Sequence, residues 1–238
     1  MNKGGFMWVV LKRYVALLGL VVVMAGCASG PGAHPSDPLE PWNRGVQGFN
    51  EAVDAAVFKP VASAYTTVTP SPVRTGVSNF FGNLRDLWSF FNALLQGRPV
   101  EAAENFMRFN VNTFLGLGGV LDIATEAGIE RTTLDFGHTL GRWGVPSGPY
   151  LVLPFFGPST LRDGVGLVVD TRGDAVVATD HVPTRNSLYA LRAVDARASL
   201  LRAGEVLDQA ALDKYSFTRD AYLQRRANQV GRPLPESP

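Results

Sequence analysis

Side chains that commonly carry catalytic or metal-binding chemistry are sparse in this sequence of 238 residues. The three histidines, His34, His138 and His181, have no partners at the spacing of metal ligands. The sequence contains neither a Gly-x-Ser-x-Gly nucleophile elbow nor a Gly-x-x-x-x-Gly-Lys-Ser/Thr phosphate loop. We therefore expect no catalytic residues, no metal and no cofactor in a binding site, and we expect the protein not to be an enzyme.

The only cysteine, Cys27, follows a segment that is typical of an export signal. Basic residues precede an apolar run, Tyr14–Met24, that is too short to span a membrane comfortably as a mature helix. The run ends in Met24-Ala25-Gly26-Cys27, which is similar to a bacterial lipobox, where cleavage leaves the cysteine N-terminal and acylated. This predicts a signal peptide over residues 1–26 and a covalent diacylglycerol and N-acyl chain on Cys27. The alternative is an ordinary signal peptide cut after Gly26 or Ala28, with Cys27 incidental.

The residue after Cys27 indicates where such a lipoprotein would be sorted. In Gram-negative bacteria an aspartate at this position typically keeps the protein at the inner membrane, so Ala28 predicts the periplasmic face of the outer membrane. No later stretch reaches the roughly 20 apolar residues of a transmembrane helix, so we expect the mature protein to lie on or in one leaflet. The Gly, Pro and Ser content of residues 27–37 predicts a flexible acylated tether.

Composition limits the kinds of partner. The formal net charge is +1 and no dense run of Lys and Arg is present, which argues against nucleic-acid binding. Hydrophobic residues make up 46% of the chain and charged residues only 18%, below the usual quarter, so fewer charges are available to cover the surface. The length suits one main domain, which we place at residues 38–230, followed by a disordered tail at 231–238.

Two adjacent apolar helices are expected between residues 76 and 122. The first carries a wide apolar stripe at helical spacing, with Ser71 as its cap and Gly97 at its end. In the second, which begins at Pro99, we expect the apolar side chains to point inward, the polar ones outward, and Glu104 to pair with Arg108. The inward set is Val100, Ala103, Phe106, Met107, Val111 and Phe114, and the outward set is Glu101, Glu104, Arg108 and Asn112.

Two interpretations of these helices stay open. They could form a helical hairpin in an ordinary core, or their many aromatic side chains could face lipid as well as protein. For the second interpretation the candidate membrane-facing residues are Phe80, Phe81, Trp88 and Phe91, together with Phe155 and Phe156 from a later segment.

That later segment, residues 141–158, is interrupted by Gly and Pro and cannot form a continuous helix. It predicts either a lone strand, a short hairpin or an extended aromatic loop. We hypothesise that Gly141, Gly144 and Gly148 are hinges of a gate. Gly116, Gly118 and Gly119 are expected to terminate the second central helix.

The other elements are also mostly helical, so the predicted fold class is all-α. We expect one helix to break at Lys59-Pro60 and a long helix to run over 187–214. Further helices are expected at 133–143, 159–170 and 216–230, and residues 171–185 are expected to be irregular.

Several motifs resemble the MlaA family, also called VacJ. They occur in the family's order, densely over residues 37–170 and loosely over 187–226. They are residues 37–44 (DPLEPWNR), 77–84 (VSNFFGNL), 95–97 (LQG), 108–119 (RFNVNTFLGLGG), 136–141 (FGHTLG), 148–155 (GPYLVLPF), 160–163 (TLRD) and 222–225 (YLQR).

The resemblance implies a ring of amphipathic helices sunk in the inner leaflet of the outer membrane, around a central amphipathic channel. Phospholipids that have strayed into the outer leaflet would pass through this channel to a soluble periplasmic carrier, MlaC, and return to the inner membrane. The resemblance also implies association with trimeric porins.

Two other function classes are compatible with parts of the sequence. One is a lipid-anchored scaffold that docks porins or other envelope partners without transporting lipid. The other is a lipid-hydrolysing enzyme, for which the sequence offers no recognisable nucleophile and base.

Overall fold

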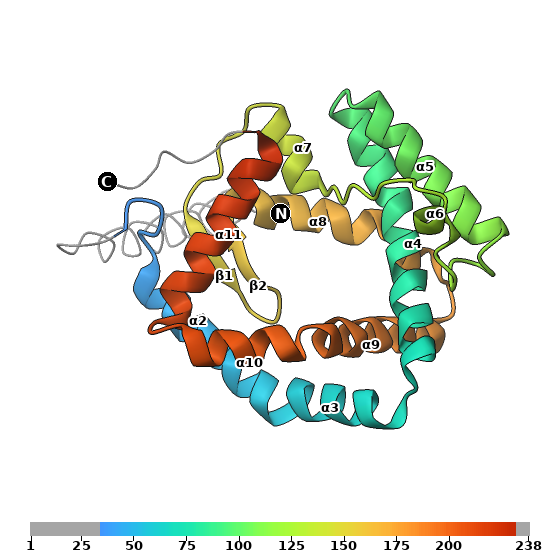
Figure 1. Ribbon diagram of the computed structural model, residues 1–238. Coiled ribbons are helices and arrows are strands. Elements are labelled where there is room, and N and C mark those ends of the chain that lie inside the picture. The colour runs from blue at the N-terminus through green and yellow to red at the C-terminus, as the bar shows by residue number, and fades with distance from the viewer. Residues whose placement is uncertain (1–33, 232–238) are drawn as a thin grey trace, which may run out of the picture.

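The helices follow one another around a ring instead of packing into a bundle (Figure 1). The computed structural model describes residues 34–231. Helix α4 forms one side of the ring, and α11 with a β-hairpin forms the other, while α7 and α8 lie along the top and α3, α9 and α10 along the bottom of the view. The predicted all-α ring is confirmed.

The elements divide the described chain as follows. The helices are α2 (Glu40–Val53), α3 (Lys59–Val68), α4 (Ser71–Leu95), α5 (Pro99–Phe114), α6 (Ile123–Glu126), α7 (Phe136–Arg142), α8 (Leu161–Gly173), α9 (Val182–Ser199), α10 (Leu201–Ala210) and α11 (Lys214–Val230), with a π-helix at Asp54–Phe58, a 3-10 helix at Ala175–Ala178, and strands β1 (Tyr150–Leu153) and β2 (Gly157–Thr160). Within residues 34–231, no helix combines the length and the apolar character that crossing a membrane requires.

Helices α4 and α5 form the expected pair, and glycines end both of them. Gly97 lies at φ +66° after α4, while Gly118 and Gly119 lie at +74° and +93° after α5. These are left-handed conformations that glycine adopts without steric cost, so the predicted terminations are confirmed. The N-cap of α4 is Pro70 and not Ser71, which is the first helical residue.

The inward and outward faces of α5 are the reverse of our expectation. Arg108 is 1% exposed and Asn112 is also buried, whereas Phe106, Met107 and Phe114 are exposed, Phe114 to 79%. Helical spacing determines which residues share a face, but it does not determine which face meets protein. The polar stripe of α5 packs on α4 and α6, and its apolar stripe forms the outer surface.

Buried charges join these three helices. Arg108 does not pair with Glu104 as expected; its Nη2 atom lies 2.7 Å from Oδ1 of Asp122, and its Nε lies 3.3 Å from Oδ2 of Asp86. Nε of Arg131 lies 2.9 Å from the other oxygen of Asp86. Burial raises the pKa of Asp86 in spite of both arginines. The network therefore fixes the arrangement of the helices at a considerable desolvation cost.

The aromatic segment is a hairpin, which resolves the alternatives left open by the sequence. Strands β1 and β2 pair antiparallel, with Tyr150 opposite Thr160. Two asparagines of α2, seven residues apart and so on one face, bind the free edge of β1. Asn43 accepts from the Val152 amide (2.9 Å) and donates to the Tyr150 carbonyl (3.0 Å), and Asn50 donates to the carbonyl of Leu153 (3.0 Å).

The start of the described chain closes the ring against α11. Asp37 is fully buried, where its carboxylate accepts hydrogen bonds from Asn43 (2.8 Å), Arg219 (3.4 Å) and the Tyr215 hydroxyl. We expected the tether to extend to residue 37. The folded domain includes Asp37 instead, because its side chain supplies these buried contacts.

Three helix boundaries also differ from expectation. The chain does not break at Lys59-Pro60, because the π-helix at Asp54–Phe58 leads directly into α3, where Pro60 lies in the first turn and needs no amide donor. The expected long helix is two helices that meet at Leu200, and neither Gly nor Pro marks this break. Residues 171–185 are largely helical, because α8 continues to Gly173, the 3-10 helix covers Ala175–Ala178 and α9 begins at Val182.

We expect Arg108→Met to lower the free energy of unfolding by about 3–5 kcal/mol, because it removes the cation that buried Asp86 shares with partly buried Asp122 and leaves only the half-exposed Arg131 beside them. Arg98→Met is the matched control: Arg98 pairs with Glu101 in a partly exposed ion pair, so its loss should cost under about 1 kcal/mol. Chemical unfolding in a mild detergent measures both. Equal effects of the two substitutions would contradict the role given to the buried network.

Asp122 should make stability sensitive to acid. Burial opposes its ionisation, but hydrogen bonds from Thr125 and Asn112 and the charge of Arg108 outweigh burial and lower its pKa to about 2. The ionised carboxylate therefore stabilises the fold fully above about pH 4, the range of an unperturbed Asp, and this contribution is lost as the pH falls toward 2. Asp122→Asn should flatten the stability profile over this interval. Asp180→Asn, at an exposed residue without a described ion pair, should leave the profile unchanged.

Candidate functional site

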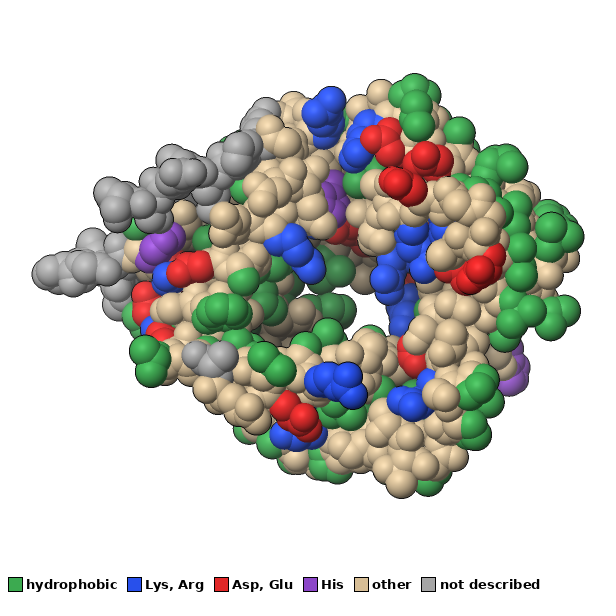
Figure 2. Space-filling model, viewed as in Figure 1, with side chains coloured by type: hydrophobic (Ala, Val, Ile, Leu, Met, Phe, Trp, Pro, Cys, Tyr) green, Lys and Arg blue, Asp and Glu red, His purple; other side chains and the backbone are tan. Residues whose placement is uncertain are grey.

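An opening passes through the middle of the ring, as the space-filling view shows (Figure 2). Its main cavity has a volume of about 400 Å³. The lining side chains come from α4, the segment before α7, the hairpin tip, α8 with the residue after it, and α9. They are Phe81, Leu84, Arg85, Trp88, Thr133, Leu134, Asp135, Phe156, Leu167, Asp170, Thr171, Asp174 and Arg192.

Helix α4 contributes one complete face to this cavity. Phe81, Leu84, Arg85 and Trp88 follow the i, i+3, i+4, i+7 rule, so they point in the same direction. Of the four residues of α4 that are candidates for membrane contact, Phe81 and Trp88 therefore line the opening, whereas Phe80 and Phe91 do not. Arg85, a charge within an otherwise apolar stripe, is the sequence signal that distinguishes this face from one that contacts lipid alone.

The candidate membrane-facing residues have different positions. Phe81 is only 5% exposed, so the prediction that it contacts the membrane is wrong. Its side chain extends from α4 to the wall of the cavity, and its ring centre lies 5.3 Å from that of Phe80. Trp88 lines the cavity, and its indole nitrogen donates to Asp170 at 2.7 Å.

Three further candidates are exposed or half-buried. Phe80 is half-buried, while Phe91 and Phe155 are exposed on the surface. Phe156 is also exposed, but it lines the cavity from the hairpin tip. Contact of Phe80, Phe91 and Phe155 with lipid stays a prediction.

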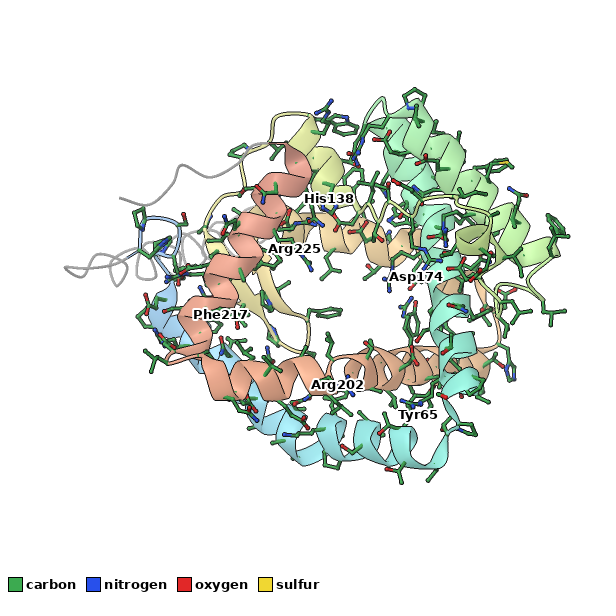
Figure 3. The ribbon with its side chains drawn as sticks, in the orientation of Figure 1. Tyr65, His138, Asp174, Arg202, Phe217 and Arg225 are labelled. Atoms are coloured by element: carbon green, nitrogen blue, oxygen red, sulfur yellow. The ribbon has the colours of Figure 1, made fainter. Side chains whose placement is uncertain are left out.

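A second cavity of about 190 Å³ adjoins the first. The two share Asp135, Phe156, Leu167 and Asp170, and the second continues toward Tyr222, Arg225 and Arg226 on α11. Figure 3 shows Arg225 on α11 and Asp174 across the ring from it. The opening therefore consists of two connected compartments, with Phe156 and Leu167 at their junction.

Most charges in the lining have partners. Asp135 pairs with Arg226 at 2.7 Å, and Asp174 pairs with Arg192 at 2.6 Å. Asp170 accepts from Trp88 and from the Phe136 amide at 2.8 Å, although burial raises its pKa. Arg85 has no ion pair with any described residue. The lining thus combines apolar walls with fixed charges, which suits a ligand that has both an apolar and a charged part.

The distribution of polarity is inverted relative to a water-soluble domain. Five asparagines and Arg108 are among the largest fully buried side chains, and the buried apolar residues form only small clusters, such as Ala93, Ala102 and Leu134. Hydrophobic side chains gather instead on the outer edge, most densely over α5 (Figure 2). Among these exposed residues are Phe91, Leu94, Leu95, Val100, Phe106, Met107, Phe114, Leu115 and Leu117.

The proposed hinge glycines differ in their surroundings. Gly144 and Gly148 have positive φ angles of +100° and +68° between α7 and β1. Gly141 lies inside α7, where an added Cβ would be 2.8 Å from Nη1 of Arg162 and 2.8 Å from Cγ1 of Val230. Close packing between helices accounts for Gly141, and a hinge at any of the three stays a prediction.

Two other predicted features concern single residues. Cys27 lies outside the described residues, so its acylation stays a prediction. His138 bonds to Gln229 and forms a capping box with Asp135 at the start of α7. Within residues 34–231, no group of three His, Cys, Asp or Glu is arranged to hold a metal ion.

Gly141→Ala should lower the free energy of unfolding by about 1–3 kcal/mol, because the methyl group overpacks the contact of α7 with α8 and α11. Gly48→Ala in α2 is the matched control, since nothing lies within 4 Å of its added Cβ, and it should raise stability by about 0.4–1 kcal/mol. Thermal and chemical unfolding measure both effects. Unchanged stability of Gly141→Ala, combined with lost function, would favour the hinge instead.

Comparison with known proteins agrees with this geometry. The family described as MlaA lipoprotein matches residues 35–229. The Intermembrane phospholipid transport system lipoprotein MlaA of Escherichia coli (strain K12) is 39% identical over 222 residues, covering 90% of this chain and 88% of the relative. The protein of the same name from Haemophilus influenzae is 35% identical over 224 residues, with the same coverage of both chains.

A solved structure, described as "Structural basis for maintenance of bacterial outer membrane lipid asymmetry", has the same fold. It superposes with a TM-score of 0.72 at 37% identity and covers 82% of this chain and 99% of that one. The match of the family to almost the whole described chain, together with these relatives, shows that the chain belongs to the MlaA lipoprotein family.

Proposed function

We propose that this protein moves phospholipids through the opening of its ring. It would remove mislocalised phospholipid from the outer leaflet of the outer membrane and deliver it to the periplasmic side, which maintains lipid asymmetry. The observation that carries the proposal is an amphipathic passage enclosed by a ring whose outer surface is apolar. Relatives named for intermembrane phospholipid transport support it.

The energetics explain why an enclosed passage is needed. Moving a two-chain phospholipid into water exposes roughly 30 methylene-sized units at about 0.8 kcal/mol each, on the order of 20–25 kcal/mol in total. Apolar walls such as Leu84, Phe156 and Leu167 would shield the acyl chains, while the polar and charged lining would receive the headgroup. With no nucleotide-binding loop in the sequence, we propose that passage is passive.

The outer surface supports a position within one leaflet of the membrane. In a membrane its exposed apolar side chains would contact acyl chains without a free-energy cost, whereas their exposure to water would be unfavourable. We propose that the ring is embedded in the inner leaflet of the outer membrane of a Gram-negative bacterium.

Two protein partners complete the proposal, and both rest on family membership. A porin trimer would dock the apolar outer face, and a soluble periplasmic carrier would receive the lipid. Purification of the intact lipoprotein from membranes should recover the porin, and substitutions of Phe106 and Phe114 by serine on the exposed face of α5 should reduce this recovery.

We also propose that Cys27 carries a diacylglycerol and an N-acyl chain. Mass spectrometry of the mature protein should give a chain that begins at Cys27 with both modifications, and Cys27→Ala should lack them. A mature chain that begins after Ala28, or an unmodified Cys27, would contradict the anchor.

Obstruction of the passage tests transport directly. Leu167→Trp places a bulky ring at the junction of the two compartments, so phospholipid should accumulate in the outer leaflet. Val168→Trp is the matched control, because Val168 is the next residue of α8, is exposed and lines neither cavity. The readout is surface phospholipid in a deletion strain complemented by each variant.

The same experiment separates a conduit from a scaffold. A scaffold that only docks envelope partners would tolerate Leu167→Trp as well as Val168→Trp. If Leu167→Trp is folded, as shown by its unfolding transition, and still restores lipid asymmetry fully, the passage is not the route of the lipid.

A further inference from the structure

The guanidinium of Arg85 has no ion pair with any described residue, a property that it shares, among the arginines lining the two compartments, with Arg225 of the second one. Arg108, Arg131, Arg192 and Arg226 each pair with at least one aspartate. Arg85 lines the main cavity, and no hydrogen bond or ion pair links it to any other described residue. It therefore presents an uncompensated positive charge to the passage.

The nearest carboxylates are already engaged. Asp86 is adjacent in sequence, but it points into the protein, where its two oxygens contact Arg131 and Arg108. Asp174 lines the same cavity and binds Nη2 of Arg192. Neutralisation of Arg85 by either of them would break an existing ion pair.

Charges of both signs surround Arg85. Arg192 lines the same cavity, and so do Asp135 and Asp174, which are in ion pairs, and Asp170, which accepts hydrogen bonds from neutral donors. Partial burial lowers the pKa of Arg85, and the charges of Arg192 and Arg131 add to this effect. Figure 2 shows basic side chains gathered along the side of the opening that α4 forms. An anion at this side would relieve the repulsion among the arginines, so binding of a negatively charged ligand group there would be favourable.

The apolar side chains around Arg85 indicate the chemistry of the remainder of the ligand. Leu84 and Trp88 flank it on the same face of α4, and Leu167 lines the same cavity from α8. A ligand that places an anionic group on Arg85 would thus place attached apolar groups against these side chains.

From this geometry we propose that Arg85 is a phosphate-binding residue of the passage, which takes the phosphodiester of a phospholipid headgroup while Leu84 and Trp88 contact its apolar part. This inference rests on the proposed function and adds to it the group that recognises the lipid. Arginine suits the task because its planar fork can donate two parallel hydrogen bonds to two phosphate oxygens, whereas lysine offers a point charge.

Binding measurements on the intact mature protein in a non-ionic, phosphate-free detergent test the assignment. The probes are dihexanoyl-phosphatidylethanolamine, dihexanoylglycerol, which lacks the phosphate, and inorganic phosphate, each titrated calorimetrically. Arg85→Gln should weaken binding of the phospholipid about tenfold, the loss expected for one charged hydrogen-bond partner, and Arg85→Lys should weaken it less. Binding of dihexanoylglycerol should be the same in wild type and Arg85→Gln.

The control is Arg172→Gln, which also removes one positive charge, from an exposed residue of α8 that lines neither compartment. It should bind the phospholipid as the wild type does. The assignment is overturned if the wild type does not bind the phospholipid, if Arg85→Gln binds it equally well, or if Arg85→Gln loses dihexanoylglycerol to the same extent. Inorganic phosphate that binds as tightly as the phospholipid would also overturn it, in favour of a free-phosphate site.

These outcomes are independent of the test of transport. Normal lipid asymmetry in a deletion strain would refute the proposed function, yet the ratio of phospholipid binding between wild type and Arg85→Gln would still decide the phosphate site. Conversely, equal binding by both proteins would remove the role of Arg85 and leave the conduit intact.

Discussion

The buried ion pairs of Asp86 and Asp122 with Arg108 and Arg131 are the interactions on which the ring depends. A ring wall is thin, so one helix must contact its neighbours, the passage and the outside with different faces. With most of the apolar face of α5 directed outward, hydrophobic burial between α5 and α4 is limited to the small cluster of Ala93, Ala102 and Leu134, and charged and amide groups supply the other buried contacts. Such groups are costly to bury unless every hydrogen-bond and ion-pair partner is present. This requirement favours one arrangement of α4, α5 and α6 over others.

The same constraint accounts for the character of the passage. Helix α4 separates three environments: its Asp86 face meets α5, its Phe81–Trp88 face meets the opening, and its end near Leu94 is exposed on the outside. Charged residues in the opening remain accessible because the ring has no filled centre. A single apolar interior would have covered Arg85 and Asp174 or excluded them.

Much of the fold could be predicted from periodicity and from the positions of Gly and Pro. Residue spacing located most helices, and Gly97, Gly118 and Gly119 marked two of their ends. The direction of each face could not be predicted, because an apolar stripe at helical spacing looks the same whether it meets protein, lipid or a passage. Contacts that are distant in sequence, such as Asn43 with the hairpin edge and Asp37 with Tyr215, leave no local signal. The break at Leu200 has none either.

Photocrosslinking in intact cell membranes tests the central claim most directly. Benzoylphenylalanine is introduced in place of Leu84, which lines the passage, or in place of Asn83, which is buried on the neighbouring face of α4. Lipid passage through the ring predicts covalent phospholipid adducts with the Leu84 variant and none with the Asn83 variant. Adducts confined to exposed positions such as Phe106, with none at Leu84 in a folded protein, would contradict the account.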